Sequence, residues 1–548
     1  MPRTQKGPAA AAPTIAARVP EPATPPARRI AFNTVIFSVA TGLSRIAGLI
    51  REVVASSYFG TSGAFSAFTI AFQVPNLIRA LVADSALTAA FVPVFTELLE
   101  QKKRKEAFAL AGALFGLILV ALGVVTVVFI VIAPVVIPPI TGGEFTNELD
   151  ELTVGLSRVM FPIVILLGLN GLVVGILNAY DHFAVPAIAP VVWNLVIIAG
   201  LVAFKPFFEG PNQVYAYAIG VLLGTVVQLG MCLPVLKHVG FHLSISFHWR
   251  DPRIRTVLML MLPVTIGLGL INFNVLINSS LGSLVSEQAP AAIDRAFRLY
   301  MLPQGIFSVA VATVLFPAMS RFANRGDLDG LRRTSANGVR QIAMLLIPAA
   351  VYTAVLAEPL TRVVYQRGEF GAGSTDAVSE ALFWFSFSLP FSGANLLLTR
   401  TFFSLRRPWF PTSLAGMSLL VNVGVSAALY SSLGIAGIVI GTAVASAAMT
   451  VAQAFFLRRQ LHGFEIGQTL KAVAGMLAAS ALLGVVSYEV WNVLDGALGN
   501  SLAAQLVSVL AAMVLGSAVY AAAVIGLRIP EAQQIVGLIR GRMGRGAS

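Results

Sequence analysis

Four arginine residues lie inside long apolar stretches of the sequence, and they give the first indication of chemistry. They are Arg45, Arg51, Arg79 and Arg298. An arginine near the centre of a membrane-spanning helix costs about 2.5–3.5 kcal/mol on insertion scales, so such residues normally face a protein interior or a water-filled cavity. A guanidinium group can also bind two phosphate oxygens at once. The four residues therefore predict a cationic cavity that binds an anion.

Other polar residues near these arginines allow two interpretations. Glu52 adjoins Arg51, and Asp84 follows Arg79 by little more than one helical turn. Internal ion pairing, or extension of the long side chain to the membrane interface, is therefore the alternative to a binding role. Five further side chains either line the same cavity or join helices through hydrogen bonds: Asn272, Asn274, Asn278, Gln304 and Ser308.

The elements that hold these residues must be membrane-spanning helices. The chain has 57% hydrophobic and only 11% charged residues, whereas soluble domains carry about 25% charged residues. Apolar runs of roughly 20 residues, the length that crosses the hydrocarbon core, recur along the whole sequence. We therefore predict an all-α polytopic membrane protein with about 14 transmembrane helices. Their approximate ranges are 32–58, 63–90, 107–138, 152–179, 184–205, 213–237, 256–283, 290–319, 336–358, 377–404, 410–430, 434–457, 470–494 and 501–527.

The distribution of basic residues predicts the orientation of the chain. Cytoplasmic loops carry an excess of Lys and Arg, and here most of these residues fall in the two terminal tails and in the loops after predicted helices two, six, eight, ten and twelve. The acidic segment 144–151 falls on the opposite side, where few basic residues are found: Lys205, Arg295, Arg362 and Arg367. We therefore expect both termini in the cytoplasm.

Proline positions predict that the chain contains two related six-helix lobes. Pro75 and Pro303 are separated by the same number of residues as Pro162 and Pro390. Because six is even, both lobes would enter the membrane in the same sense, with a site at their interface. The predicted units are a disordered basic N-terminal tail (1–30), an N-lobe (31–238), a C-lobe (239–460), two C-terminal helices (461–527) and a basic C-terminal tail (528–548).

The sequence also argues against several classes of function. It contains no GxxxxGK[ST] phosphate-binding loop, its only cysteine is Cys232, and its five histidines fall in loops or at their edges. It shows no intramembrane cluster of His and carboxylates of the kind that metal or acid–base chemistry needs. The net charge of +12 reflects the basic loops and not nucleic acid binding. We therefore expect a transporter and no enzyme, with no metal site and no cofactor.

Several short segments carry a family resemblance: Ser44-Arg45-Ile46-Ala47-Gly48, Ile50-Arg51-Glu52, Phe72-Gln73-Val74-Pro75-Asn76-Leu77-Ile78-Arg79, Ala90-Phe91-Val92-Pro93, Pro186-Ala187-Ile188-Ala189-Pro190 with Asn194, Arg298 with Pro303 and Gly305, and Tyr365-Gln366-Arg367-Gly368-Glu369-Phe370. In these segments the chain resembles the MurJ (MviN) family of lipid II flippases. That family belongs to the multidrug/oligosaccharidyl-lipid/polysaccharide exporter superfamily. The resemblance covers most of the chain between the two tails and is most specific in the first two predicted helices.

The resemblance implies a V-shaped, two-lobed transporter with alternating access in the inner membrane of a bacterium. It implies that cavity arginines bind the pyrophosphate and sugar headgroup of lipid II, and that the helices within 461–527 form a groove for the polyprenyl tail. Its partners would be lipid II, membrane lipids and other proteins of cell-wall synthesis. The candidate substrate-binding residues are Arg45, Arg51, Arg79, Arg298, Glu52, Asn76, Asn274 and Gln304.

The chain departs from the family at some positions near the cavity. Some relatives have an acidic residue where this chain has Ser66, and others have charged neighbours around the arginine that matches Arg298, where this chain has Phe297 and Met301. Some members bind sodium through carboxylates in the second lobe, but the predicted helix 256–283 contains none. The residues therefore give no support for a sodium site on that helix.

Three other classes of protein are alternatives: another exporter of the same fold, a membrane enzyme and a non-transporting scaffold. An exporter of another polyprenyl-linked saccharide would need a similar cavity, whereas an exporter of cationic drugs would present carboxylates. A membrane enzyme acting on polyprenyl phosphates would alter its substrate, while a flippase only relocates it. A non-transporting scaffold would give the buried arginines no use.

Overall fold

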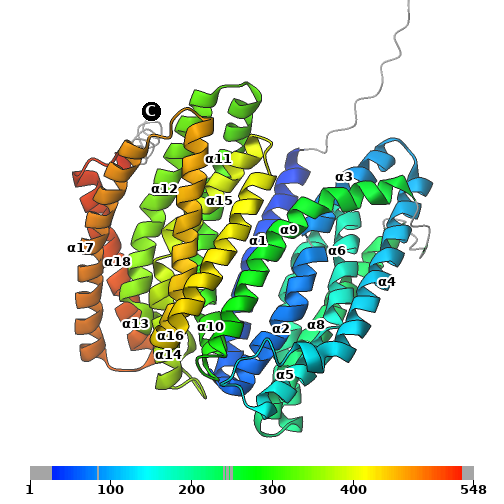
Figure 1. Cartoon of the computed structure of the whole chain (residues 1–548), viewed down its shortest axis with the longest axis horizontal. Helices are drawn as coiled ribbons and strands as arrows, with labels where there is room; N and C mark the ends of the chain where they lie inside the picture. The colour runs from blue at the N-terminus through cyan, green and yellow to red at the C-terminus, as the bar shows by residue number, and fades with distance from the viewer. Residues whose placement is uncertain (1–26, 83–84, 239–240, 242–245, 247–250, 534–548) are drawn as a thin grey trace, which may run out of the picture.

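In the computed structural model, every regular element of the described residues is helical. The structure describes residues 27–82, 85–238 and 251–533, together with positions 241 and 246. Figure 1 shows long helices that run side by side, with the start and the end of the described chain in different parts of the bundle. The prediction of an all-α polytopic membrane protein is confirmed.

The first half of the chain forms eight α-helices joined by short connections. They are α1 (Ala27–Phe59), α2 (Gly63–Val82), α3 (Ser85–Glu100), α4 (Arg104–Val136), α5 (Asn147–Met160), α6 (Ile163–Ala179), α7 (Ala184–Phe204) and α8 (Val214–His238). Two short 3₁₀ turns, Lys205–Phe207 and Gly210–Gln213, join α7 to α8. Helix α1 begins at Ala27, so the last residues of the predicted tail 1–30 are helical, and residues 1–26 lie outside the described part.

The second half forms ten α-helices and one π-helical turn. They are α9 (Pro252–Gly282), α10 (Ala289–Pro303), the π turn Gln304–Ser308, α11 (Val309–Asn324), α12 (Leu328–Val355), α13 (Ala357–Tyr365), α14 (Ala372–Ser386), α15 (Leu389–Ser404), α16 (Trp409–Gln460), α17 (Ile466–Leu498) and α18 (Leu502–Gly526). Of the predicted tail 528–548, residues 534–548 lie outside the described part.

Helix starts and breaks follow from local chemistry. Side-chain oxygens accept a hydrogen bond from the first turn at four helix starts: Thr146, Asp251, Asp327 and Ser501. Helices α5 and α6 are separated at Phe161 and Pro162, and α14 meets α15 at a 49° bend just before Pro390. A proline lacks the amide hydrogen and clashes with the preceding turn. Both breaks therefore lie at Pro162 and Pro390, the two prolines that occupy equivalent positions in the predicted lobes.

The number of membrane spans is compatible with the predicted fourteen. Among the described residues, 11 helices are long and apolar enough to cross a membrane, or up to 12 if the bent pair α14 and α15 forms one span. This count treats the 52 residues of α16 as one helix, although Gly434 (φ 58, ψ −132) interrupts it. A straight helix of that length would extend about 78 Å, more than twice the hydrocarbon core. The count also omits α1, whose 33 residues include charged side chains.

Helix α9 joins the two halves of the molecule. It packs against α2 and α3 on one side and against α10 and α16 on the other. Its buried residues Val257, Met261 and Leu276 belong to a hydrophobic cluster made mainly by the first half. The lobe boundary between 238 and 239 stays a prediction, because α9 contacts both halves.

Helices α17 and α18 pack on each other, and α17 also packs on α12 while α18 also packs on α13. Ion pairs fix α17 near both ends: Arg340 Nη1 lies 3.1 Å from Glu465 Oε2 just before its first turn, and Arg362 pairs with Asp495 in its last turn. The remaining face of the pair exposes large apolar side chains, such as those of Val485. An exposed apolar face of this extent suits contact with lipid.

Candidate functional site

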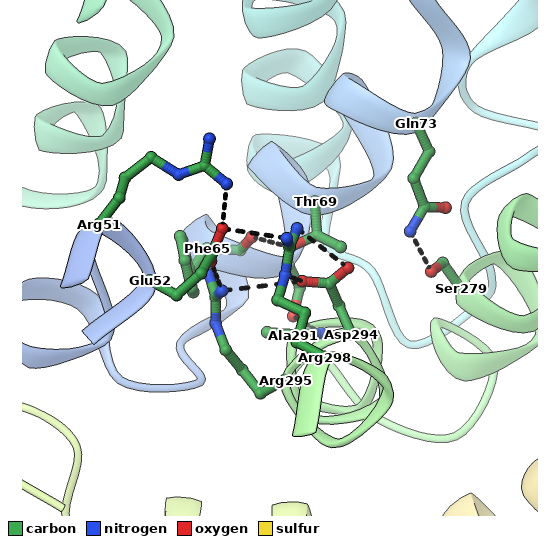
Figure 2. A network of polar contacts seen from close by, with 11 residues as sticks. Arg51, Glu52, Phe65, Thr69, Gln73, Ser279, Ala291, Asp294, Arg295 and Arg298 are labelled. Carbon is green, nitrogen blue, oxygen red and sulfur yellow. Dashed lines mark hydrogen bonds and ion pairs between the residues drawn. The ribbon is translucent and has the colours of Figure 1, made fainter. Parts of the chain in front are cut away.

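Five charged side chains from α1 and α10 meet between the two halves of the molecule. Arg51 and Glu52 come from the last third of α1, and Asp294, Arg295 and Arg298 come from the first turns of α10. Figure 2 shows these side chains converging from the two helices. We call these five residues the charge cluster.

Glu52 is at the centre of the charge cluster. Its carboxylate pairs with Arg51 and with Arg295, and its Oε1 lies 3.0 Å from Nη1 of Arg298. Asp294 holds the other edge of Arg298: its Oδ2 accepts from Nε at 2.8 Å and its Oδ1 from Nη2 at 3.4 Å. Arg298 therefore contacts two carboxylates, one at each of two edges of its guanidinium group.

Burial differs strongly among the three guanidinium groups. The side chain of Arg295 is 2% exposed, that of Arg51 is 11% exposed and that of Arg298 is 35% exposed. Three guanidinium groups face two carboxylates, which leaves a surplus of one positive charge. Neighbouring side chains therefore do not neutralise the arginines completely, and Arg298 is the most accessible of them.

Aromatic rings support the two more buried arginines. The guanidinium carbon of Arg51 lies 4.9 Å from the ring centre of Trp193 on α7, and that of Arg295 lies 4.3 Å from the ring centre of Phe65 on α2. Such cation–π contacts stabilise a desolvated guanidinium group. Ser66 follows Phe65, and its hydroxyl accepts a hydrogen bond at 3.2 Å from the amide of Ala291, which fixes the first turn of α10 against α2.

A cavity opens beside the charge cluster. Its free space is about 20 Å³, room for about one water molecule, and the five cluster residues form part of its wall. The rest of the wall comes from α2 and α8, and includes Thr69, Gln73 and Tyr217. Gln73 also donates a hydrogen bond at 2.7 Å to Ser279 on α9. The cavity thus combines surplus positive charge with neutral hydrogen-bonding groups.

The structure brings together three of the eight predicted site residues: Arg51, Glu52 and Arg298 line this cavity. Arg79 and Asn76 form a separate network further along α2. Arg79 donates from Nε and Nη2 to Asn76 Oδ1 at 3.0 and 2.8 Å, and Asn76 donates to Asn272 at 3.1 Å. Asp84, the predicted ion-pair partner of Arg79, lies outside the described residues.

Arg45 and Gln304 lie close to the π turn after α10. Arg45 is exposed, and its Nη1 lies 3.5 Å from the position that a Cβ would take on Gly305. The side-chain oxygen of Gln304 is buried, and no hydrogen-bond partner for it occurs among the described residues. Both residues are outside the wall of the cavity at the charge cluster.

Asn274 takes part in hydrogen bonding between helices. Asn422 of α16 donates to Asn274 at 2.6 Å and to Asn278 at 2.8 Å, and Asn278 donates to Thr442 at 3.0 Å. Asn422 itself is 1% exposed. These contacts agree with the alternative that Asn274 joins helices through hydrogen bonds. The binding role of Asn274 stays a prediction.

Two residues of the charge cluster were missed as site candidates. Arg295 was predicted to lie on the side of the membrane that is poor in basic residues, but it is almost fully buried. Asp294 was not considered, although its spacing from Arg298 is the i, i+4 spacing of helical ion pairs. That spacing was the available signal.

The fold and the cavity define a polytopic α-helical membrane transporter. A multidrug resistance transporter of the MATE family, solved in an inward-facing conformation, has the same fold with a TM-score of 0.67 at 16% sequence identity, covering 78% of this chain and 98% of that one. The family model described as lipid II flippase MurJ matches residues 55–508, and the chain belongs to this family.

Individual relatives agree with this assignment. The chain is 30% identical over 414 residues to the probable lipid II flippase MurJ of Rickettsia prowazekii, covering 75% of this chain and 80% of the relative. It is 33% identical over 347 residues to the lipid II flippase MurJ of Burkholderia cenocepacia, covering 62% and 67%. A solved lipid II flippase MurJ in an inward closed conformation shares the fold with a TM-score of 0.74 at 21% identity, covering 90% and 99%.

Proposed function

We propose that this chain moves lipid II from the cytoplasmic to the outer leaflet of a bacterial inner membrane by alternating access. Membership of the MurJ family supports the substrate. The charge cluster supports the chemistry, because a cavity with surplus positive charge suits a pyrophosphate. The observation that carries the proposal is the partly exposed Arg298 in a cavity where guanidinium groups outnumber carboxylates.

The arginines would replace the water around the pyrophosphate. Moving an isolated, unpaired anion into hydrocarbon costs tens of kcal/mol by Born solvation. Arg298 is the most accessible guanidinium group of the charge cluster, and Arg51 lines the same cavity. In this proposal both turn hydrogen-bond donors from carboxylates to phosphate oxygens. Glu52 would repel the phosphate, so it acts as a competitor for the arginines and not as a ligand.

The other predicted residues would serve the sugar and peptide portions of the headgroup. With the N-terminus in the cytoplasm, Arg45 lies nearer the cytoplasm than Arg51 along α1, and Arg79 lies nearer the cytoplasm than Gln73 along α2. The headgroup would therefore contact the remaining predicted residues as it enters from the inner leaflet. They are Arg45, Arg79, Asn76, Asn274 and Gln304. The apolar faces of α17 and α18 would hold the polyprenyl tail.

Contacts near the charge cluster would close the outer end of the path. The amide of Glu369 donates to Ser57 at 2.9 Å, and the hydroxyls of Thr61 and Ser374 lie 2.9 Å apart. With the proposed orientation, these contacts between the halves are extracytoplasmic. They would have to open before the headgroup could leave, which is the step that alternating access requires.

The membrane potential would favour export. With the cell interior negative, moving one negative charge outward gains about 2.3 kcal/mol per 100 mV, so a doubly charged headgroup gains roughly 4–5 kcal/mol. This is the upper limit, reached when the protein charges do not cross the field with the substrate. Transport by this route needs no nucleotide hydrolysis.

The proposal is tested by Arg298→Ala in vesicles that contain the full-length chain and fluorescent lipid II. We expect translocation to fall to background, because the accessible guanidinium group is lost, while the amount of folded protein in the membrane is unchanged. Arg321→Ala is the matched control, since Arg321 is exposed at the end of α11. Full translocation by the Arg298 variant would contradict the assigned role. Extracted lipid II should be chemically unchanged, and a modified product would favour an enzyme.

A further inference from the structure

Arg295 is the most deeply buried charged residue of the charge cluster. Its side chain is 2% exposed, and it lies between Phe65 of α2 on one side and Glu52 of α1 on the other. Its Nη1 also lies 3.8 Å from Asp294 Oδ2. The hydrogen bond from Ala291 to Ser66 fixes the helical turn that precedes it. Arg295 is therefore held in place by groups from three helices and has little surface left for a ligand.

The proposed binding step creates a problem for Glu52. Its carboxylate is 5% exposed and contacts three guanidinium groups, two of which would turn to the phosphate. A buried carboxylate that loses all its cationic partners is strongly destabilised. Some cation must therefore stay with Glu52 when Arg51 and Arg298 are recruited by the headgroup.

We infer that Arg295 is a positioning residue that retains Glu52 and so frees Arg51 and Arg298 for the anionic headgroup. This inference rests on the proposed function and names a residue that acts without touching the substrate. The contacts support this division of roles: Arg295 is fixed by Phe65 and pairs with Glu52, whereas Arg298 is partly exposed and shared between two carboxylates.

The charge of the cluster gives the expected behaviour of variants. The wild-type cluster has one surplus positive charge. Arg295→Met removes that surplus and leaves Glu52 with only Arg51 and Arg298, which should then hold it more tightly. Adding Glu52→Gln to Arg295→Met removes both members of the pair and restores one surplus positive charge. Arg295→Lys keeps the charge but loses the planar group that stacks on Phe65.

The test measures binding of farnesyl pyrophosphate to the full-length chain in detergent, with farnesol as the uncharged control. Trp193 reports directly on Arg51, which lies over its ring, so its fluorescence should change when Arg51 turns to the anion. Trp193→Phe identifies this signal among the five tryptophans. A purely structural role of Arg295 would not couple its loss to that signal.

We expect Arg295→Met to weaken pyrophosphate binding roughly tenfold or more, since one unit charge near a dianion is worth more than 1 kcal/mol at an effective dielectric constant of about 20. The double variant should recover most of the affinity and the Trp193 signal, and Arg295→Lys should be intermediate. Should Arg295→Met fail to fold, Arg295→Lys and the double variant still decide: weaker binding by Arg295→Lys with recovery in the double variant supports the inference, and wild-type binding by both overturns it.

Two results would overturn the inference. Unchanged binding by Arg295→Met would show that Arg295 has no part in freeing the other arginines. Lost binding in both Arg295→Met and the double variant would show that Arg295 contacts the anion itself or only supports the fold. Either result leaves the proposed function intact provided that Arg298→Ala abolishes binding. Wild-type binding by Arg298→Ala would instead refute the proposed function.

Discussion

The carboxylate of Glu52 contacts three guanidinium groups, and these contacts determine which arginines of the cavity are accessible to a ligand. Arg295 is almost fully buried beside Glu52, while Arg298 retains a partly exposed guanidinium group. A charge deep in the membrane is tolerated only with partners or water. The charge cluster satisfies that condition and still leaves one positive charge for a ligand.

Asn274 was predicted either to bind substrate or to join helices through hydrogen bonds, and a single substitution tests the second role. Asn422→Ala removes the donor to Asn274 and Asn278. One buried and one partly buried acceptor lose a partner, so we expect a loss of about 1–2 kcal/mol in stability. The midpoint of thermal unfolding in detergent measures this loss. Asn212→Ala is the control, because Asn212 is exposed in a short 3₁₀ turn. Equal midpoints for both variants would show that the network does not stabilise the protein.

Sequence reasoning found part of the charge cluster for a clear reason. Arg51, Glu52 and Arg298 interrupt apolar segments, and that interruption is visible without a structure. Arg295 and Asp294 lie near the start of a predicted span, where a charge normally meets water or headgroups. Whether such a turn ends at the membrane surface or is covered by another helix depends on tertiary packing. Here Phe65 and Glu52 cover it, and no local pattern indicates that.

At the scale of elements, the end of α1 and the loop before α14 approach each other closely. Gly60 (φ 57) lies at the end of α1 and Gly368 (φ 61) lies in that loop. A Cβ on Gly60 would meet the carbonyl oxygen of Glu369 at 2.6 Å, and one on Gly368 would overlap the carbonyl oxygen of Ser57. Each turn therefore needs glycine, both for its backbone angles and for the approach of the other chain segment.

Gly368→Ala should weaken this contact, because the added methyl group has no space and the backbone angle is unfavourable. We expect the outer end to open more often, which would increase labelling of a cysteine introduced by Thr69→Cys with a membrane-impermeant reagent. Gly371→Ala is the matched control, since its φ is −83 and nothing lies within 4 Å of its added Cβ. Equal labelling of the two variants would argue against a closing contact.

The elements themselves were largely predictable, and their exceptions have physical causes. Apolar runs separated by short polar segments predicted the spans from α4 to α8 within a few residues. The separation within Trp409–Gln460 was also expected, and Gly434 provides it. The packing of α9 on both halves was not expected, because an apolar helix carries no mark of which neighbours it contacts.

At the scale of the whole molecule, the proposed alternating access requires the two halves to separate and close at alternating ends. Thr61→Cys together with Ser374→Cys places two thiols where hydroxyls now lie 2.9 Å apart. In a background with Cys232→Ser, oxidation should link the turn after α1 to α14 and stop translocation, and a reductant should restore it. Each single cysteine variant is the control. Unimpaired transport by the cross-linked protein would exclude opening at this end.

The central claim is that the charge cluster carries the lipid II headgroup across the membrane. The most direct measurement is the accessibility of lipid II at the outer surface of cells depleted of this protein and supplied with a variant. Wild-type chain and Arg321→Ala should restore accessibility, whereas Arg51→Ala and Arg298→Ala should leave lipid II inside at normal protein levels. Restored accessibility with both cavity arginines removed would contradict the account.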